Sequence, residues 1–257
     1  CGLLVLATIQ HANGKLTIRL GEPLHEGTLY LEAFTVYIGL FFLLLILPSL
    51  LGIAHPWLSY GGLVVLSLTG LLWPMLRGLN RATAFRDLGL YRGEGVLKEI
   101  GAGLAGYVAV LPVVAIGFAV TLAWIVLSQK YFPPPPEEGP ELISHPVVVW
   151  IAHGGTGVRL AVLFLASGFA PFFEEALFRG ALFRDLRRFH GPVLSAVIMG
   201  LLFAAIHPQG IAMIPALAGL AVGFALIREW RGSLVAPMAA HALHNGVLVG
   251  FMWLAFS

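Results

Sequence analysis

Seven apolar segments of bilayer-spanning length restrict the folds open to this chain. They comprise residues 33–54, 58–76, 102–128, 160–182, 192–207, 211–227 and 234–256. A helix of about 17 to 25 apolar residues crosses the hydrocarbon core of a membrane. Inside that core every backbone polar group must be bonded within the protein, which a helix achieves on its own. We therefore predict an all-α fold, a polytopic transmembrane helix bundle with about seven (six to eight) spans.

The composition places the chain in a membrane rather than in water. Hydrophobic residues make up 58% of the chain, charged residues only 11%, and the mean hydropathy is +0.89. These values lie outside the range of soluble globular domains. The net charge of +2 is too small to indicate a nucleic-acid partner. We expect a multi-pass integral protein of the cell membrane, with the lipid bilayer as a partner.

The sequence divides at a proline-rich loop, although we expect one integral domain. Residues 1–146 contain the N-terminal membrane helices and the loop, residues 130–146, which is built around PPPPEEGPE. Residues 147–257 contain the helices with the polar motifs. Residues 2–9 and 147–152 are apolar but too short to cross, and we interpret the second stretch as interfacial. A single cysteine, Cys1, excludes an internal disulfide and a cysteine metal cage.

Two adjacent carboxylates, Glu174 and Glu175, lie inside an apolar segment. An ionisable side chain there costs about 2.5 to 3.5 kcal/mol on insertion scales, so it indicates a functional site. Residues four apart share a helix face, which puts Arg179 beside Glu175. Glu174 is turned by about 100° from Glu175. We predict a structural ion pair between Glu175 and Arg179, and a Glu174 that faces a cavity and acts as a general base.

Three further polar residues lie in the apolar segments that follow: His207, His241 and Asn245. The spacing of four residues puts Phe203 over His207, and His241 beside Asn245. At a rise of about 1.5 Å per residue, these side chains and the carboxylate pair fall at a similar depth in the membrane. We therefore predict that they form a single site. We interpret His244 as an additional polar contact.

These residues belong to three motifs that resemble those of a known family. Residues 174–179 match EExxxR, residues 203–207 match FxxxH, and residues 241–245 match HxxxN. In this order and within apolar segments, they are similar to the motifs of the CPBP family of intramembrane proteases. That family is the abortive-infection group, which includes the CAAX prenyl endopeptidases. The resemblance covers about residues 160–250, and it is specific because three motifs occur together.

The resemblance implies an intramembrane endopeptidase that hydrolyses a peptide bond of a membrane-associated or lipidated protein. In the CAAX enzymes the first glutamate and the FxxxH histidine activate water, which assigns this role to Glu174 and His207. The HxxxN histidine and asparagine stabilise the oxyanion, which assigns that role to His241 and Asn245. The supporting residues are Glu175, Arg179 and Phe203.

The resemblance leaves the dependence on a metal open, because family members are described both as metalloproteases and as glutamate proteases. Two histidines and a glutamate form a known catalytic zinc set, which Glu174, His207 and His241 would supply. The motif HExxH is absent from the sequence. We therefore favour a mechanism that requires no cofactor, and keep a zinc-dependent version of the same protease as the alternative.

Two further alternatives come from other classes of protein. Buried glutamate, histidine and arginine also occur in proton-coupled membrane transporters. Many transporters contain an inverted repeat, and none is evident in this sequence. A non-catalytic membrane scaffold of the same fold is the other alternative, against which the complete set of three motifs argues.

Overall fold

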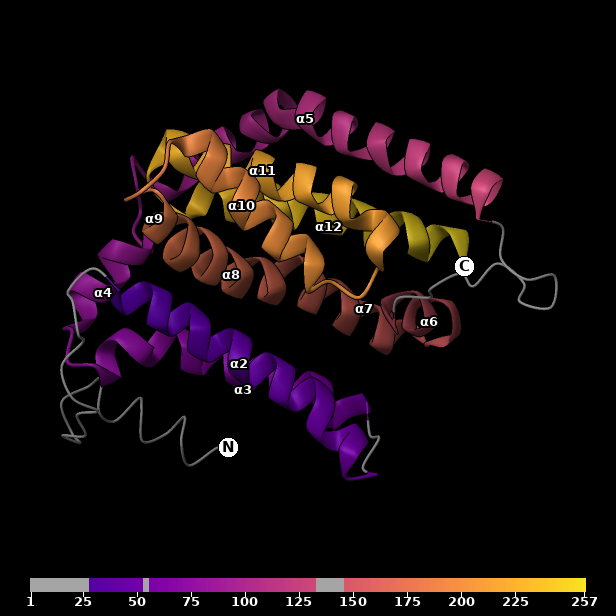
Figure 1. Cartoon of the computed structure of the whole chain (residues 1–257), viewed down its shortest axis with the longest axis horizontal. Helices are drawn as coiled ribbons and strands as arrows, with labels where there is room; N and C mark the ends of the chain where they lie inside the picture. Colours follow the sequence, from indigo (N-terminus) through magenta and orange to yellow (C-terminus); the bar gives the residue numbers. More distant parts are fainter. Residues whose placement is uncertain (1–27, 53–55, 133–145) are drawn as a thin grey trace. The chain divides into compact units, whose positions relative to one another are not determined.

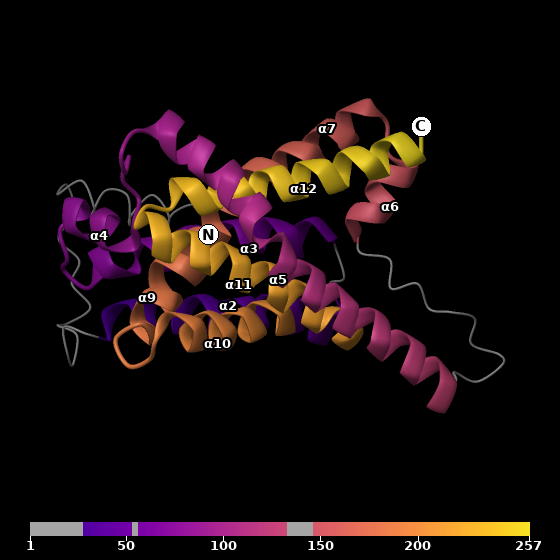
Figure 2. The same cartoon turned by 90° about the horizontal axis from the view of Figure 1, so that it is seen from above.

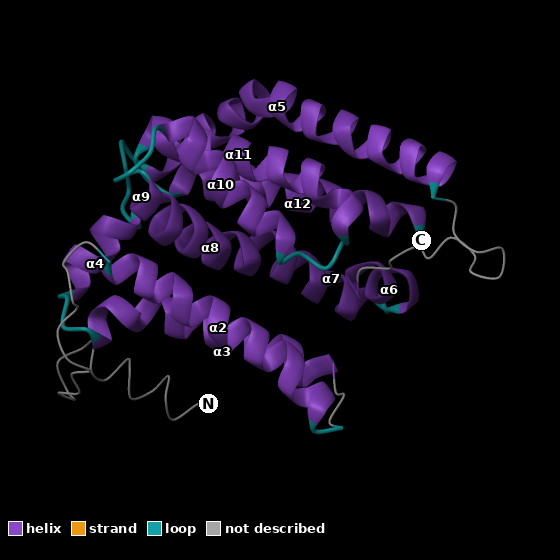
Figure 3. Ribbon diagram, viewed as in Figure 1, coloured by secondary structure: helices purple, strands orange, loops and turns teal. Residues whose placement is uncertain are grey.

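The computed structural model describes residues 28–52, 56–132 and 146–257 of the chain. Within these ranges the regular secondary structure is helical, with no strand (Figure 3). Each of the seven predicted apolar segments contains helix. The predicted all-α fold is therefore confirmed.

The long helices are α2 (Leu29–Leu50), α3 (Pro56–Leu76), α5 (Val96–Tyr131), α10 (Pro192–Ala205), α11 (Ile214–Arg231) and α12 (Val235–Ala255). The fourth predicted segment is a continuous series of short elements: α7 (Thr156–Phe164), η1 (Leu165–Phe169), α8 (Ala170–Glu174), η2 (Glu175–Leu182) and α9 (Phe183–Leu186). Of these, η1 and η2 are π-helical. The other described elements are α4 (Arg81–Leu88), α6 (Pro146–His153) and the 3₁₀ turn η3 (Ile211–Met213).

Within the described residues, five helical stretches are long and apolar enough to cross a membrane: Leu29–Leu47, Val96–Tyr131, Thr156–Leu186, Ile211–Arg231 and Val235–Ala255. Shorter apolar helices, Val65–Leu76 and Pro192–Ala205, lie in the other two predicted segments. The protein is therefore a multi-pass integral membrane protein, as predicted. Residues 147–152 belong to α6, which has eight residues and is too short to cross.

Two interpretations made from the sequence concern residues outside the described ranges. They are the apolar stretch 2–9 after Cys1 and most of the proline-rich loop, residues 133–145. The predicted start of that loop is wrong, because α5 continues through Lys130 to Tyr131.

The chain forms two compact units. The first unit consists of Cys1–Tyr91 and Phe173–Phe189, and the second of Arg92–Phe172 and His190–Ser257. The division of the sequence at the end of the proline-rich loop, after residue 146, stays a prediction. The motif residues of the first unit are Glu174, Glu175 and Arg179, and those of the second are Phe203, His207, His241 and Asn245.

In the first unit, α2 and α3 lie side by side, and η2 contacts both (Figure 1). The ring of Phe178 on η2 meets Phe34 edge-on at 5.2 Å and Tyr37 at 6.5 Å, measured between centroids. Aromatic pairs prefer such edge-to-face arrangements because the ring edge is positive and the face negative. These contacts hold the π-helical segment that begins with Glu175 against α2.

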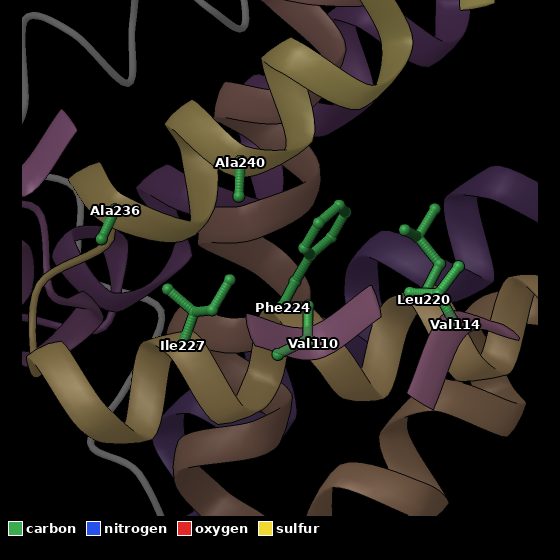
Figure 4. Packing of buried hydrophobic residues seen from close by; sticks show 7 residues of the cluster. All are labelled: Val110, Val114, Leu220, Phe224, Ile227, Ala236 and Ala240. Carbon is green, nitrogen blue, oxygen red and sulfur yellow. The ribbon is translucent and has the colours of Figure 1, made fainter. Parts of the chain in front are cut away.

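In the second unit, α11 packs against α5 and α10, while α12 packs against α5 and η1 (Figure 2). Lipid tails are as apolar as leucine, so close packing rather than the hydrophobic effect drives the association of membrane helices. The core at the contact of α5, α11 and α12 consists of Val110, Val114, Leu220, Phe224, Ile227, Ala236 and Ala240 (Figure 4).

An ion-pair cluster lies at the C-terminal end of α11. Arg231 Nη2 lies 2.7 Å from Oε1 of the buried Glu99 and 3.3 Å from Oε1 of Glu94. The side chain of Glu94 is 68% exposed. The buried carboxylate is thus paired, whereas Glu94 makes an exposed ion pair of the kind that contributes about 0 to 1 kcal/mol to stability.

Glycines allow α5 and α11 to approach each other closely. A Cβ atom at Gly117 would collide with the carbonyl oxygen of Pro215. One at Gly219 would lie 3.1 Å from the carbonyl oxygen of Val113 and 3.3 Å from the Cα of Gly117. Small residues at membrane helix contacts permit the two backbones to meet in this way.

We expect Gly117→Val to destabilise the second unit. The new side chain would force α5 away from Pro215, and overpacking of this kind costs about 1 to 3 kcal/mol or more. Thermal unfolding of the purified protein in detergent measures the loss as a lower midpoint. Gly101→Val is the control in the same helix, because a Cβ atom there meets nothing within 4 Å. Equal midpoints for the two variants would show that the glycine contact is not needed.

Candidate active site

The buried carboxylate of the pair lies in the first unit, at the start of the π-helical segment η2. Phe183 N–H donates to the carbonyl oxygen of Phe178, the i to i+5 bond that defines a π-helix. The side chains of Glu175 and Arg179 are completely buried, and Arg179 Nη1 lies 3.0 Å from Glu175 Oε1. The ion pair predicted from the i, i+4 spacing is therefore confirmed.

Glu174 ends α8, one residue before the π-helical segment, and is half-buried. The positive charge of Arg179 acts on Glu174 as well as on Glu175. Tyr37 of α2 also lies within electrostatic range of the Glu174 carboxylate. Glu174 is therefore more accessible than Glu175 while both carboxylates lie close to one compensating charge.

His207 lies just beyond the end of α10 in the second unit. The helix ends at Ala205 because Pro208 has no N–H with which to continue the backbone bonding. His207 Nδ1 lies 2.6 Å from the carbonyl oxygen of Phe203. A carbonyl only accepts hydrogen bonds, so Nδ1 carries the proton. In the neutral imidazole the lone pair is then on Nε2, the nitrogen that can accept a proton or bind a metal.

Phe203 packs against two of the predicted site histidines. Its ring centroid lies 4.1 Å from that of His207 and 6.5 Å from that of His241. The predicted stacking of Phe203 and His207 is confirmed. The prediction that the helix continues to His207 is wrong, and the proline at position 208 is the physical reason. Two motif histidines, one just after α10 and one in α12, thus border one aromatic side chain.

His241 is buried in α12 and stacks on Phe224 of α11, with ring centroids 5.0 Å apart and planes 27° apart. Phe224 also meets His244 edge-on, at 6.5 Å. Analysis of the sequence missed Phe224, because nothing distinguishes it from the other apolar residues of its segment. Its position in the core fixes the ring plane of His241.

His244 makes a hydrogen bond with Tyr107 of α5, with 2.9 Å between the Tyr107 hydroxyl and His244 Nδ1. Their rings also meet at 5.9 Å. The interpretation of His244 as an additional polar contact is therefore confirmed. Analysis of the sequence also missed Tyr107, although a hydroxyl inside an apolar segment was a usable signal.

Asn245 donates from Nδ2 to the carbonyl oxygen of Ala166 in η1, at 2.8 Å. An asparagine amide has two N–H groups, and the bond to Ala166 uses one of them. The side chain is thus held by the backbone of a neighbouring element and still has a second N–H to donate.

An apolar groove of about 580 Å³ opens on the second unit between α5, α12 and the segment η1–α8. Leu104, Phe172, Met238 and Leu243 are among the residues that line it, and Ser167 is the one polar residue of its lining. The groove follows the same helix, α12, that carries His241 and Asn245. Its lining offers a surface to an apolar ligand.

Neither unit by itself gathers three His, Cys, Asp or Glu side chains into a metal site within its described residues. The predicted zinc donors are divided between the units, because Glu174 belongs to the first and His207 and His241 to the second. As donors they have the right chemistry for zinc, and the Nε2 lone pair of His207 suits either a proton or a metal. The zinc alternative therefore stays a prediction.

Comparison with known proteins points to the same region. Residues 156–247 match the model of a family described as type II CAAX prenyl endopeptidase Rce1-like. A curated relative, the membrane-embedded CAAX protease MroQ of Staphylococcus aureus (strain USA300), is 27% identical over 159 residues. The alignment covers 56% of this chain and 59% of the relative, so the chain spans less than two thirds of that protein. No solved structure matches the chain.

The matched region contains all three motifs, from Glu174 to Asn245. The fold and the motif residues define a polytopic helical membrane protein with buried ionisable groups. The two matches confirm the resemblance found in the motifs. Over residues 156–247 the chain is similar to the CAAX prenyl endopeptidases, the group that its motifs resemble.

Proposed function

We propose that this protein is a CAAX-type intramembrane endopeptidase that hydrolyses a peptide bond of a membrane-associated or lipidated protein. The observation that carries the proposal is the family match over residues 156–247, which contains the three motifs in order. The description of the relative MroQ as a membrane-embedded CAAX protease adds support. A shared site is further supported by the two motif histidines that border Phe203.

The first step of the proposed reaction is the activation of water by Glu174 and His207. Glu174 removes a proton from the water as a general base. His207 Nε2 accepts a hydrogen bond from the same water and holds it in position, a role that requires the tautomer set by the bond to Phe203. The water oxygen bonds to the peptide carbonyl carbon. When the C–N bond breaks, the proton on Glu174 passes to the leaving amine.

His241 and Asn245 then donate hydrogen bonds to the oxyanion. The carbonyl oxygen becomes negatively charged when water attacks, and donors already in position stabilise that charge best where bulk water is excluded. His241 is 3% exposed and its ring plane is set by Phe224. Asn245 contributes the N–H that the Ala166 carbonyl does not use. Removal of one such donor typically costs about 100- to 1,000-fold in rate.

The proposed mechanism requires no metal, and a zinc-dependent version with Glu174, His207 and His241 as ligands is its alternative. Zinc would lower the pKa of a bound water and so supply the nucleophile. A chelator separates the two versions. We expect cleavage to persist after treatment with 1,10-phenanthroline, whereas loss of cleavage that added zinc restores would support the zinc version.

The test of the proposed function measures cleavage by purified protein in lipid nanodiscs. The probe is an internally quenched peptide with a farnesylated C-terminal Cys-aliphatic-aliphatic-X sequence, together with its unfarnesylated twin. We expect the wild type to cleave the probe and His207→Ala to be about 100- to 10,000-fold slower, the usual contribution of a positioned acid or base. His153→Ala is the control, since it removes an exposed histidine at the end of α6.

Equal cleavage by the wild type and His207→Ala would contradict the assigned roles. A wild type that cleaves neither peptide but moves protons in a proteoliposome flux assay would instead favour a transporter. Preference for the farnesylated peptide would assign a lipidated substrate, and equal cleavage of the twins a substrate recognised by its peptide alone.

A further inference from the structure

The π-helical turn η1 leaves one backbone carbonyl without a helical donor. In an α-helix the carbonyl oxygen of Ala166 would accept from the N–H of residue 170. Here Ala170 N–H donates to Leu165 instead, in the i to i+5 pattern of a π-helix. The same pattern assigns Ala166 a donor at residue 171, which is Pro171 and has no N–H. Neither helical donor therefore serves Ala166.

Asn245 supplies the hydrogen-bond donor that the Ala166 carbonyl lacks within its helix. Its Nδ2 lies 2.8 Å from the Ala166 oxygen. A carbonyl away from water is costly to leave without a donor, most of all inside a membrane. The contact also decides the orientation of the side-chain amide, because only its nitrogen can donate to a carbonyl. The end of the amide that faces Ala166 is thus fixed as nitrogen, and the second N–H takes a defined direction.

We propose that Pro171 and the Ala166 carbonyl act as a positioning device for Asn245. Pro171 keeps the carbonyl free of a helical bond, and the free carbonyl holds the amide so that its second N–H is ready for the oxyanion. The inference rests on the proposed function, in which Asn245 is an oxyanion donor. Pro171 is a positioning residue, since it acts through Asn245.

The test restores the missing N–H. Pro171→Ala and Pro171→Val both give residue 171 a donor that competes with Asn245 for Ala166, although the two side chains differ in volume. We expect each variant to lower kcat for the farnesylated probe by about 10- to 100-fold, as for a misplaced catalytic group. KM should change little, because a donor used only in the transition state affects kcat. Similar losses in both variants would attribute the effect to the N–H rather than to packing.

Two controls accompany these variants. Pro112→Ala removes an exposed proline from the interior of α5, and we expect wild-type cleavage from it. Thermal unfolding reports whether each protein is folded, and a variant with a lowered midpoint is compared at a temperature where it is fully folded. A rise in KM with kcat unchanged would overturn the inference, because Pro171 also lines the apolar groove and would then act there.

A double-mutant cycle gives the decisive comparison. In an Asn245→Ala background the Ala166 carbonyl has no amide to hold, so Pro171→Ala should have no further effect on kcat. If Pro171→Ala lowers kcat by the same factor in both backgrounds, the inference is overturned while the proposed function stands. If Asn245→Ala cleaves the probe as fast as the wild type, the proposed role of Asn245 fails, and the inference fails with it.

Discussion

Glu174→Gln is expected to lower cleavage of the farnesylated probe by about 10²- to 10⁴-fold, the range of a lost general base. Glutamine has nearly the same shape as glutamate and still accepts a hydrogen bond from water, but it cannot remove a proton. Glu174 is only half-buried, whereas the ion pair of Glu175 and Arg179 is completely buried and stays intact. The fold should therefore tolerate the change. Single-turnover cleavage measures the chemical step, and the thermal midpoint should stay close to that of the wild type.

The matched control for this variant is Glu94→Gln, which removes an exposed carboxylate from the second unit. We expect it to cleave as the wild type does. A Glu174→Gln protein that keeps cleavage within a few-fold of the wild type would remove Glu174 from the chemistry. In that case the first glutamate of the EExxxR motif would have a purely structural role, as we predict for the second.

The second large effect concerns the ion pair of Glu175 and Arg179. We expect Glu175→Gln or Arg179→Met to lower the free energy of unfolding by about 3 to 5 kcal/mol, because each removes the 3.0 Å ion pair of a completely buried charge. Reversible unfolding in a mixed-micelle system measures this difference. Arg179→Met also removes the positive charge that acts on Glu174, so we expect it to lower cleavage even where the protein remains folded.

The double variant Glu175→Leu/Arg179→Met shows whether stability is lost because the ion pair is missing or because one buried charge is left uncompensated. Replacement of a buried ion pair by apolar side chains of similar volume is often neutral or stabilising by about 1 to 4 kcal/mol, so the double variant should recover most of the stability. Glu94→Gln again serves as the control, with an expected loss within about 1 kcal/mol. Additive losses in the double variant would mean that packing of the two side chains, and not their charge, holds this segment.

Contacts between residues four apart were predictable from the sequence. The ion pair of Glu175 with Arg179 and the stacking of Phe203 on His207 both follow from the i, i+4 spacing, which depends only on helix geometry. The apolar segments were predictable for a similar reason, since the thickness of the bilayer sets the length of a spanning helix. The end of α10 was predictable from Pro208, although the sequence analysis continued the helix to His207.

Contacts between elements were not predictable from one sequence. The stacking of His241 on Phe224 depends on how α11 and α12 pack, and the hydrogen bond of His244 depends on where α5 brings Tyr107. The bond of Asn245 to Ala166 requires a π-helical turn that apolar periodicity does not reveal. Only the proline at 171 hints at that turn, and a proline in a membrane helix has several common explanations.

The way in which two motif side chains of the second unit are oriented affects how a mutational scan of this protein should be interpreted. His207 and Asn245 are both oriented by main-chain oxygens, those of Phe203 and Ala166. An amino-acid exchange cannot delete a main-chain oxygen, so a scan would not detect the groups that orient these side chains. The Phe203 oxygen is left available because the helix ends and His207 N–H donates to Ala204 instead. For the Ala166 oxygen a scan would detect Pro171, the residue whose missing N–H leaves it available. A strong effect at Pro171 would then be evidence about site geometry rather than about helix stability.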